Sequence, residues 1–273
     1  MRYDRAMSDP RCCENRHLRI EGGAPAGERA GALAVEEPLE IRIHGRPVTV
    51  TMRTPGDDFD LAAGLLLTEG ILRECRDIGT IRHCAEDEPN IVDVTPATGV
   101  SLDLSRLRRN LVGTSSCGLC GKVAIEQVRT IAPPLRSTLH VPIRTILRLP
   151  EAMRRAQATF EKTGGLHAAG LFAADGSLEV LREDVGRHNA VDKTIGAQVL
   201  SNRTPLEDRI LMVSGRASFE ILQKALMASI PVVCAVSAPS SLAVAFARES
   251  GMTLVGFLRG TDANIYAGEG RID

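Results

Sequence analysis

Tryptophan is absent from the 273 residues, and Phe, Trp and Tyr together make up only 3% of them. No apolar run approaches the roughly 18 residues that a membrane-spanning helix needs, so we expect no membrane partner. Charge bias is also missing, because 33 Lys and Arg oppose 34 Asp and Glu, for a formal net charge of -1. This balance argues against a nucleic-acid partner, and any anionic ligand must be held by local groups.

A secretory leader is not evident either, because the basic first residues, MRYDRAMSDPRCCENRHLRIEGG, contain no apolar segment. A cytoplasmic location is therefore the default expectation. The seven cysteines are an odd number and are scattered, which does not indicate a disulfide framework. Cys12 and Cys13 lie in a polar stretch and are interpreted as incidental. Cys234 lies in PVVCAV and is interpreted as a small buried apolar residue.

Apolar residues make up 44% of the chain and charged residues 25%, which is typical of a globular protein with a sizeable core. The pattern predicts four parts: a poorly ordered tail (1–30), a small α+β domain (31–112), a mobile loop (113–122) and an α/β domain (123–273).

The small domain is predicted from alternating and helical patterns. EPLEIRIHGRPVTVTMRT alternates apolar and polar residues around HGRP, which indicates a β-hairpin. A helix is expected next, capped by Asp57 or Asp58, with an apolar face that includes Phe59 and Leu66. Two further short strands are expected at IVDVTP and VSLDL.

The second half alternates helices with apolar strands. A helix is expected from Pro150 to Gly164-Gly165, followed by a hairpin that turns at Asp175-Gly176. The apolar strands RILMVSG, PVVCAV and TLVGFL are then separated by helices. Apolar strands of this kind indicate a sheet covered on both faces, so the sequence predicts a three-layer α/β domain.

The segment GTSSCGLCGK contains Cys117 and Cys120. Two cysteines supply half of the ligands of a structural zinc, and no second C-x-x-C completes the set. A redox dithiol is an alternative, but the surrounding βαβ frame of a thioredoxin-like site is missing. A third alternative is an accessible sulfur-carrying thiolate, with Lys122 lowering its pKa. An inert surface loop is the plain alternative, and the residues alone leave the choice open.

Polar residues follow four successive strands of the predicted sheet, at the ends where an α/β sheet binds ligands. Charged residues at a solvent-exposed helix start would also explain the first of these turns, 182–193. His167, a lone histidine near the same sheet, is as compatible with a structural role as with a functional one. Free N–H groups at helix starts and forked guanidinium groups suit phosphate. The candidate residues from these turns are Arg187, His188, Lys193, Ser214, Gly215, Arg216 and Arg259.

The order of the domains resembles that of zinc deaminases, whose signature is H-x-E followed by P-C-x-x-C. His167 is followed by Ala168-Ala169 and therefore lacks the glutamate. The C-x-x-C precedes the histidine and has no proline before it. Deaminase chemistry is therefore not expected, even if the fold is related.

Four motifs together resemble one family. GTSSCGLCG, TGGLHAAG, EDVGRHNAVDK and SGRASFEILQKA occur in this order in the FdhD family of formate dehydrogenase accessory sulfurtransferases. The resemblance begins at about residue 36 and includes EEPLEIRIHG and TPGDDFDLAAGLLLTEGI. It implies a homodimer whose large domain has a cytidine deaminase-like α/β fold.

The resemblance also implies a function. An L-cysteine desulfurase would load sulfur onto Cys117 as a persulfide, assisted by Cys120. The sulfur would pass to the molybdenum of a bis(molybdopterin guanine dinucleotide) cofactor before this enters the catalytic subunit of formate dehydrogenase. GDP or GMP would mimic part of that cofactor. A binding module that hands over the cofactor without sulfur chemistry is the rival hypothesis, and a zinc-stabilised interaction protein is a third. The segment that matches the cofactor-binding residues of the family is Phe257, Leu258, Arg259, Gly260, Thr261 and Asp262.

Overall fold

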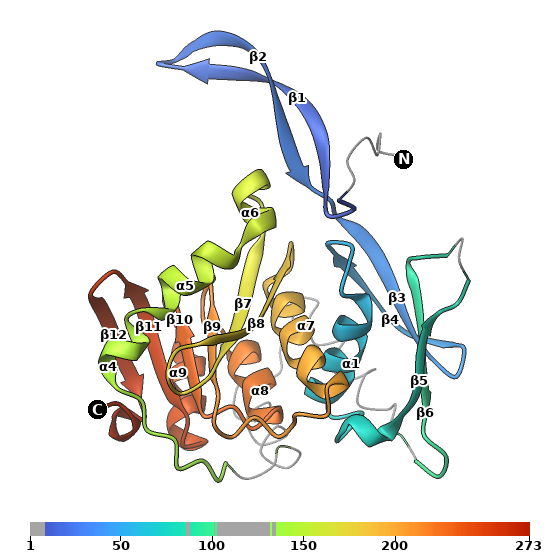
Figure 1. Cartoon of the computed structure of the whole chain (residues 1–273), viewed down its shortest axis with the longest axis vertical. Coiled ribbons are helices and arrows are strands. Elements are labelled where there is room, and N and C mark those ends of the chain that lie inside the picture. The colour runs from blue at the N-terminus through green and yellow to red at the C-terminus, as the bar shows by residue number, and fades with distance from the viewer. Residues whose placement is uncertain (1–8, 86–87, 101, 103–131, 133–134) are drawn as a thin grey trace.

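The computed structural model describes residues 9–85, 88–100, 102, 132 and 135–273 (Figure 1). Two β-sheets are joined by packed helices, and a hairpin arm extends from one end of the molecule. Cys117 and Cys120, with the predicted mobile loop at 113–122, lie outside the described residues.

The larger sheet has six strands in the order β12-β11-β10-β9-β7-β8. Its strands are β7 (His167–Phe172), β8 (Leu178–Asp184), β9 (Ile210–Val213), β10 (Val232–Ala235), β11 (Thr253–Arg259) and β12 (Asp262–Ala267). β9, β10 and β11 are parallel, whereas β7, β8 and β12 each run antiparallel to a neighbour. Every residue of β9 and β10 is buried, as expected for short apolar strands covered on both faces.

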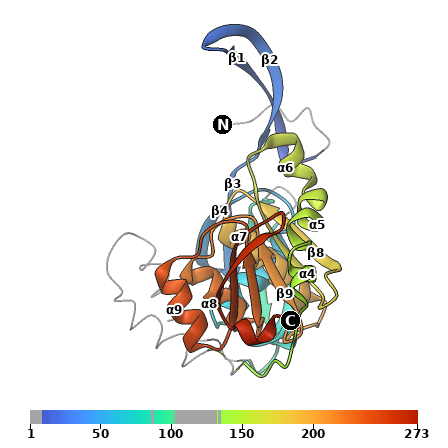
Figure 2. The same ribbon diagram turned by 90° about the vertical axis from the view of Figure 1, so that its left-hand side faces the viewer.

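Helices cover both faces of this sheet, which confirms the predicted three-layer α/β arrangement (Figure 2). One face carries α7 (Arg187–Leu200), α8 (Phe219–Met227) and α9 (Ser241–Glu249). The other carries α4 (Ile143–Ile146) and α5 (Leu149–Ala156). Apolar side chains from both helical layers pack against the strands, so the sheet forms the centre of the core.

The helix expected from Pro150 to Gly164-Gly165 is instead two helices, and that prediction is wrong in this respect. α5 ends at Ala156, and α6 (Ala158–Thr163) follows. The physical reason is the buried carboxylate of Glu183, which accepts the backbone N–H groups of Thr159 at 2.9 Å and Phe160 at 2.7 Å. An acceptor at this place caps the start of a new helix.

The smaller sheet has the order β4-β3-β6-β5. Its strands are β3 (Glu37–Ile43), β4 (Arg46–Arg53), β5 (Ile78–His83) and β6 (Ile91–Pro96), with a 3-10 turn, η1 (Cys75–Asp77), before β5. The structure confirms the predicted hairpin and the strand IVDVTP, and it adds β5, which the sequence analysis did not predict. The predicted strand VSLDL lies mostly outside the described residues.

α1 (Asp58–Thr68) lies between the two sheets and confirms the predicted helix, but not the predicted cap, because Asp57 at the N-cap position makes no side-chain capping hydrogen bond. Leu61 and Leu66 pack in the core of the smaller sheet. Ala63 and Leu67 belong to the core that includes α7. The helix is apolar on both sides because it is covered on both sides, and it thereby joins the two halves of the chain.

The arm is a two-stranded hairpin formed by β1 (Cys12–Glu21) and β2 (Ala24–Ala34) (Figure 1). The prediction of a poorly ordered tail over residues 1–30 is therefore wrong from residue 12 onward. Gly22 and Gly23 both adopt positive φ, 59° and 85°, and so form the two-residue turn that favours a hairpin. The Gly-Gly pair was a signal for a hairpin turn in the sequence, but the polar and small residues around it indicated disorder.

The base of the arm is attached to the body. Cys12 and Cys13 are buried, which differs from the expectation of incidental cysteines in a polar tail. Asp9 forms an ion pair with Lys162 of α6 at 3.6 Å. Beyond this base, most side chains of the arm are exposed. No helix within the described ranges is long and apolar enough to cross a membrane.

Candidate ligand-binding edge

The strands of the larger sheet bring four polar segments to one edge. β9, β10 and β11 are parallel, so their carboxyl ends lie together. β7 begins there and β8 ends there, because His167 pairs with Asp184 and Ala169 pairs with Val213. We call this the carboxyl edge and define it as His167, 184–188, 214–218, 236–240 and 257–262.

Backbone hydrogen bonds hold the connections at this edge side by side. The N–H of Val236 donates to the carbonyl of Val213 at 3.2 Å, and that of Ser240 donates to Ala217 at 3.0 Å. The N–H of Phe257 donates to the carbonyl of Ser237 at 3.1 Å. The loops before α8 and α9 are thus extensions of the sheet, which makes the edge a fixed surface.

Arg187 is the first residue of α7 and belongs to this edge. Its Nε atom is buried and has no hydrogen-bond partner within the described part of the chain. A buried donor without a partner is costly, and a bound ligand is one way to satisfy it. Gly215 leaves this place open, because a Cβ there would lie 3.4 Å from His167 Nδ1 and 3.9 Å from Arg187 Cδ.

His167, whose role the sequence left open, therefore lies at the same place as Arg187. Partial burial lowers the pKa of His167, and the neighbouring Arg187 cation lowers it further. A neutral imidazole can both donate and accept a hydrogen bond. The edge thus combines a permanent cation with an uncharged hydrogen-bonding ring.

His188 is partly buried between α7 and α8. Burial, with Arg187 and Lys224 nearby, lowers its pKa to about 4, although Glu220 and Glu69 act in the opposite direction. Its Nε2 atom lies 3.5 Å from Ser218 Oγ and 4.0 Å from Glu220 Oε2. At neutral pH this histidine is also uncharged.

The loop after β9 places Ser214 and Arg216 differently. Ser214 Oγ accepts the N–H of Ala168 at 2.9 Å, so this hydroxyl group also joins β9 to β7. Arg216 is exposed at the edge, and its guanidinium group is available to solvent or a ligand. Ser214 thus supports the loop from which Arg216 projects.

The segment 257–262 forms the end of β11 and the turn into β12. Phe257 is 42% exposed, although it is a large apolar residue. Arg259 is exposed, and its Nε donates to the carbonyl of Val236 at 3.1 Å. Gly260 adopts a φ of 55° in the turn with Thr261, and Asp262 pairs with Arg259. Phe257 and Arg259 therefore project at the edge, with the turn beyond them.

Two predicted ligand contacts are corrected by the structure. The side chain of Leu258 is fully buried and packs in the core beneath the edge. Lys193 is 1% exposed and pairs with Asp184, with 2.8 Å between Nζ and Oδ2. Lys193 lies six residues after Arg187, which at about 100° per residue turns it to another face of α7. Its ammonium group therefore faces the protein interior.

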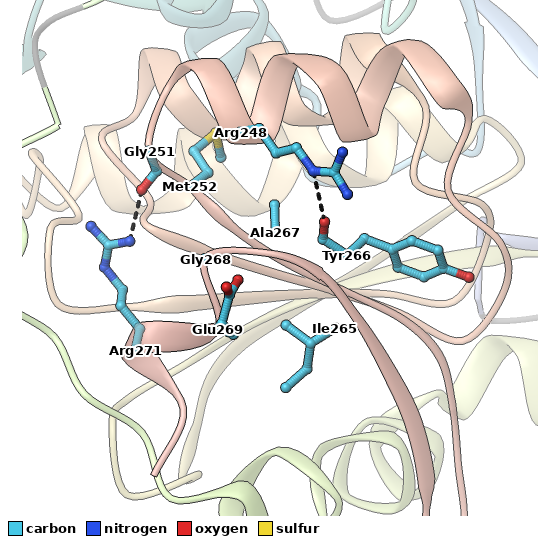
Figure 3. Close-up of a pocket in the computed structure, with 9 residues that line it drawn as sticks. All are labelled: Arg248, Gly251, Met252, Ile265, Tyr266, Ala267, Gly268, Glu269 and Arg271. Carbon is cyan, nitrogen blue, oxygen red and sulfur yellow. Dashed lines mark hydrogen bonds between the residues drawn. The ribbon is translucent and has the colours of Figure 1, made fainter.

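A pocket of about 790 Å³ lies elsewhere, near the start of β11 (Figure 3). Its arginines already donate to backbone carbonyls, Arg248 to Tyr266 at 3.2 Å and Arg271 to Gly251 at 2.7 Å. None of the residues predicted from the sequence lines this pocket. The polar residues of the carboxyl edge therefore lie outside this pocket.

The carboxyl edge offers guanidinium groups, neutral imidazoles, hydroxyl groups and an open glycine. These groups suit a ligand with anionic oxygens and planar rings. The fold and the edge together define an α/β protein that presents these polar groups at the carboxyl ends of its parallel strands, where sheets of this class bind ligands.

Comparisons with known proteins agree with this class. The sequence model of the FdhD/NarQ family matches residues 34–273. A protein of Streptomyces avermitilis named sulfur carrier protein FdhD is 53% identical over 268 residues, which cover 93% of each chain. A protein of the same name from Mycobacterium tuberculosis is 50% identical over 255 residues, covering 89% of this chain and 92% of its own.

A crystal structure from Desulfotalea psychrophila, described as a formate dehydrogenase accessory protein, has the same fold. Its TM-score is 0.78 at 25% sequence identity, and the match covers 97% of this chain and 100% of that one. The chain belongs to the FdhD/NarQ family.

Proposed function

We propose that this protein is a sulfur carrier that serves formate dehydrogenase. It receives sulfur from an L-cysteine desulfurase as a persulfide on Cys117. It delivers that sulfur to the molybdenum of a bis(molybdopterin guanine dinucleotide) cofactor, which is its substrate. The observation that carries the proposal is the match of about 50% identity, over most of the chain, to relatives named sulfur carrier protein FdhD.

The sulfur chemistry balances with the two cysteines of the motif. The Cys117 thiolate attacks the terminal sulfur of the desulfurase persulfide, that S–S bond breaks, and the donor cysteine leaves as a thiolate. Attack by Cys120 on the inner sulfur of the Cys117 persulfide then releases hydrosulfide and leaves a Cys117–Cys120 disulfide. The two thiols supply the two electrons that reduce the transferred sulfur, and a cellular thiol resets the pair.

The carboxyl edge supports the second half of the proposal. The cofactor is a polyanion with two guanines, and Arg187, Arg216 and Arg259 offer guanidinium groups to phosphates and ring carbonyls. The Nε of Arg187, which has no hydrogen-bond partner among the described residues, fits an anionic oxygen. The donor desulfurase, the catalytic subunit of formate dehydrogenase, a homodimeric state and a cytoplasmic location are parts of the same proposal.

Sulfur loading tests the first step. The wild-type protein is incubated with a cysteine desulfurase and L-cysteine and is then analysed by intact-mass and peptide mass spectrometry. We expect a gain of at least one sulfur on the peptide that contains Cys117. Unchanged mass in a protein that still binds the cofactor would favour a chaperone without sulfur chemistry. Stoichiometric zinc with unchanged mass would favour a zinc-stabilised interaction protein.

Nucleotide binding tests the second step. GDP contains the guanine and phosphate groups of the cofactor, and titration calorimetry measures its affinity. We expect Arg216→Ala to weaken GDP binding, because the exposed guanidinium group is lost from the edge. Unchanged affinity would remove Arg216 from the site.

A further inference from the structure

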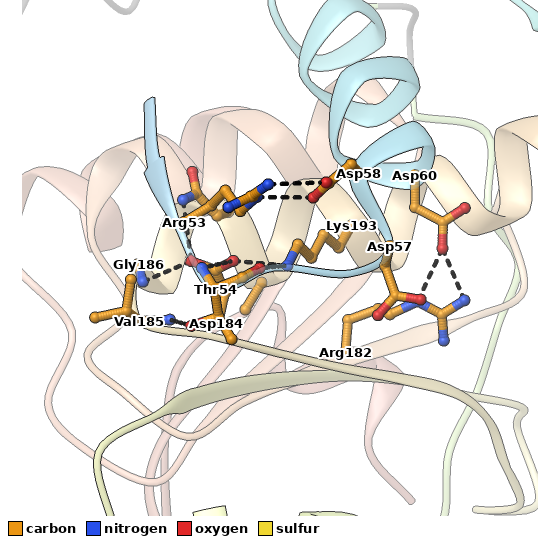
Figure 4. A network of polar contacts seen from close by, with 12 residues as sticks. Arg53, Thr54, Asp57, Asp58, Asp60, Arg182, Asp184, Val185, Gly186 and Lys193 are labelled. Carbon is orange, nitrogen blue, oxygen red and sulfur yellow. Dashed lines mark hydrogen bonds and ion pairs between the residues drawn. The ribbon is translucent and has the colours of Figure 1, made fainter. Parts of the chain in front are cut away.

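Asp184 lies directly beneath the first turn of α7 and is fully buried (Figure 4). Its Oδ2 accepts the N–H of Thr54 at 3.1 Å and lies 2.8 Å from Lys193 Nζ. Its Oδ1 accepts the N–H of Gly186 at 2.8 Å and the amide of Asn189 at 3.0 Å. The four contacts occupy the acceptor sites of the carboxylate.

Lys193 completes this arrangement from the middle of α7. Its Nζ also donates to the backbone carbonyl of Thr54 at 2.8 Å. The ion pair therefore joins β8, α7 and the segment before α1, which belong to different halves of the chain (Figure 4). Apolar residues in the same positions would stabilise the core as well as the buried ion pair does. What the ion pair supplies in addition is a set of directional contacts.

The contacts of the pair surround Arg187 and His188. Gly186 precedes the helix, and its N–H is held by Asp184. Asn189 follows, and its amide donates to Asp184 and also to the carbonyl of Met52 at 2.7 Å. The residues on each side of Arg187 and His188 are thus fixed from the interior.

We propose that the Asp184–Lys193 ion pair positions the ligand-binding edge by holding the first turn of α7 in place. Arg187 and His188 then face the ligand from a turn that the ion pair anchors from below. Asp184 and Lys193 are positioning residues and do not touch the ligand. The proposal deepens the proposed function and rests on the carboxyl edge as the binding surface.

A second buried ion-pair cluster next to this one serves as the control. Asp192 and Lys224 are also buried, with 2.9 Å between Oδ2 and Nζ, and Lys224 Nζ lies 3.3 Å from Glu69 Oε1. Thr68 Oγ1 donates to Asp192 at 2.7 Å and accepts from Lys224 at 3.0 Å. This pair joins α7 to α8 and to the last turn of α1, so it makes no contact with Gly186 or Asn189.

The test compares two sets of substitutions that each remove all the charges of one buried ion-pair cluster. Asp184→Asn with Lys193→Met removes the positioning pair, and Asp192→Asn with Lys224→Met and Glu69→Gln removes the control cluster. GDP affinity is measured by calorimetry on the folded fraction, with unfolding midpoints recorded for both. We expect the first variant to bind GDP at least about tenfold more weakly, and the control to stay within about twofold of the wild type, even if both unfold earlier.

Equal affinity in the first variant and the wild type would overturn the positioning role, as would equal weakening in both variants. A wild-type protein that does not bind GDP would instead count against the proposed ligand. In that case, hydrogen exchange of the backbone amides of residues 186–190 tests the positioning role without reference to GDP. It must be faster in the first variant than in the control, and equal rates overturn the proposal.

A milder variant covers the case in which the first double variant does not fold. Asn189→Ala removes contacts to Asp184 and Met52 without leaving an unpaired charge. We expect faster exchange at 186–188 and weaker GDP binding. Wild-type behaviour in both measurements would contradict the proposal.

Discussion

Gly64 of α1 and Gly196 of α7 meet where the two helices cross. A Cβ at Gly64 would lie 1.8 Å from the carbonyl oxygen of Asp192, and one at Gly196 would lie 1.8 Å from that of Asp60. Both helices therefore approach to the distance that only glycine permits. This crossing joins the smaller sheet unit to the α/β unit that carries the carboxyl edge.

Gly196→Ala should therefore strongly destabilise the protein. The added methyl group meets backbone, which can yield only if α1 and α7 separate. We expect the free energy of unfolding to fall by at least about 3 kcal/mol, the upper range for overpacking. Urea denaturation measures this value. Gly270→Ala is the control because a Cβ there meets no atom within 4 Å, and a loss as large in the control would contradict the explanation.

Arg187→Met should weaken GDP binding while preserving the fold. The substitution keeps an apolar stem but removes the guanidinium group whose Nε has no partner in the described structure. We expect a loss of about 10- to 100-fold in affinity, equivalent to about 1.5–3 kcal/mol for a charged hydrogen bond. Titration calorimetry provides the measurement. Arg203→Met changes an exposed arginine beyond the other end of α7 and should bind as the wild type does.

His188 should make the protein less stable as the pH falls. Its folded-state pKa, about 4, lies below the ordinary value of 6.5, so the unfolded chain binds more protons between these values. The contribution to stability is complete above pH 6.5 and is lost as the pH falls toward 4. His167 acts in the same direction.

His188→Gln cannot take up this proton and should show a shallower decline in unfolding free energy from pH 7 to pH 5. Urea midpoints at several pH values measure the slope. The same slope in variant and wild type would show that His188 does not titrate as its burial implies.

Cys117→Ala should abolish the activation of formate dehydrogenase without unfolding the protein. The change removes a single sulfur atom, on which the proposed persulfide forms. Complementation of a strain that lacks the carrier, scored by formate dehydrogenase activity, measures the outcome. Cys84→Ala changes an exposed cysteine at the end of β5 and should retain activity. Full activity of Cys117→Ala would remove this residue from the transfer.

Much of the α/β unit was predictable because its signals are local. Apolar runs bounded by Gly, Ser and Pro specify β9, β10 and β11, and the carboxyl ends of parallel strands must share an edge. The arm was missed because small and polar residues are common to disordered tails and exposed hairpins. β12 was missed because its residues are largely exposed and give no regular alternation.

The sequence by itself determined the family, through the motifs that resemble it. It also determined the order of the elements from α7 to β11 and the place of Arg187, Gly215 and Arg259 at strand ends, which follow from residue order and local periodicity. The tertiary structure alone decided which polar residues lie at the carboxyl edge and which face the interior. Lys193 differs from Arg187 because Asp184 and Thr54, distant along the chain, enclose its ammonium group in the interior. A buried charge must find its partner, and only the packed chain places that partner within reach.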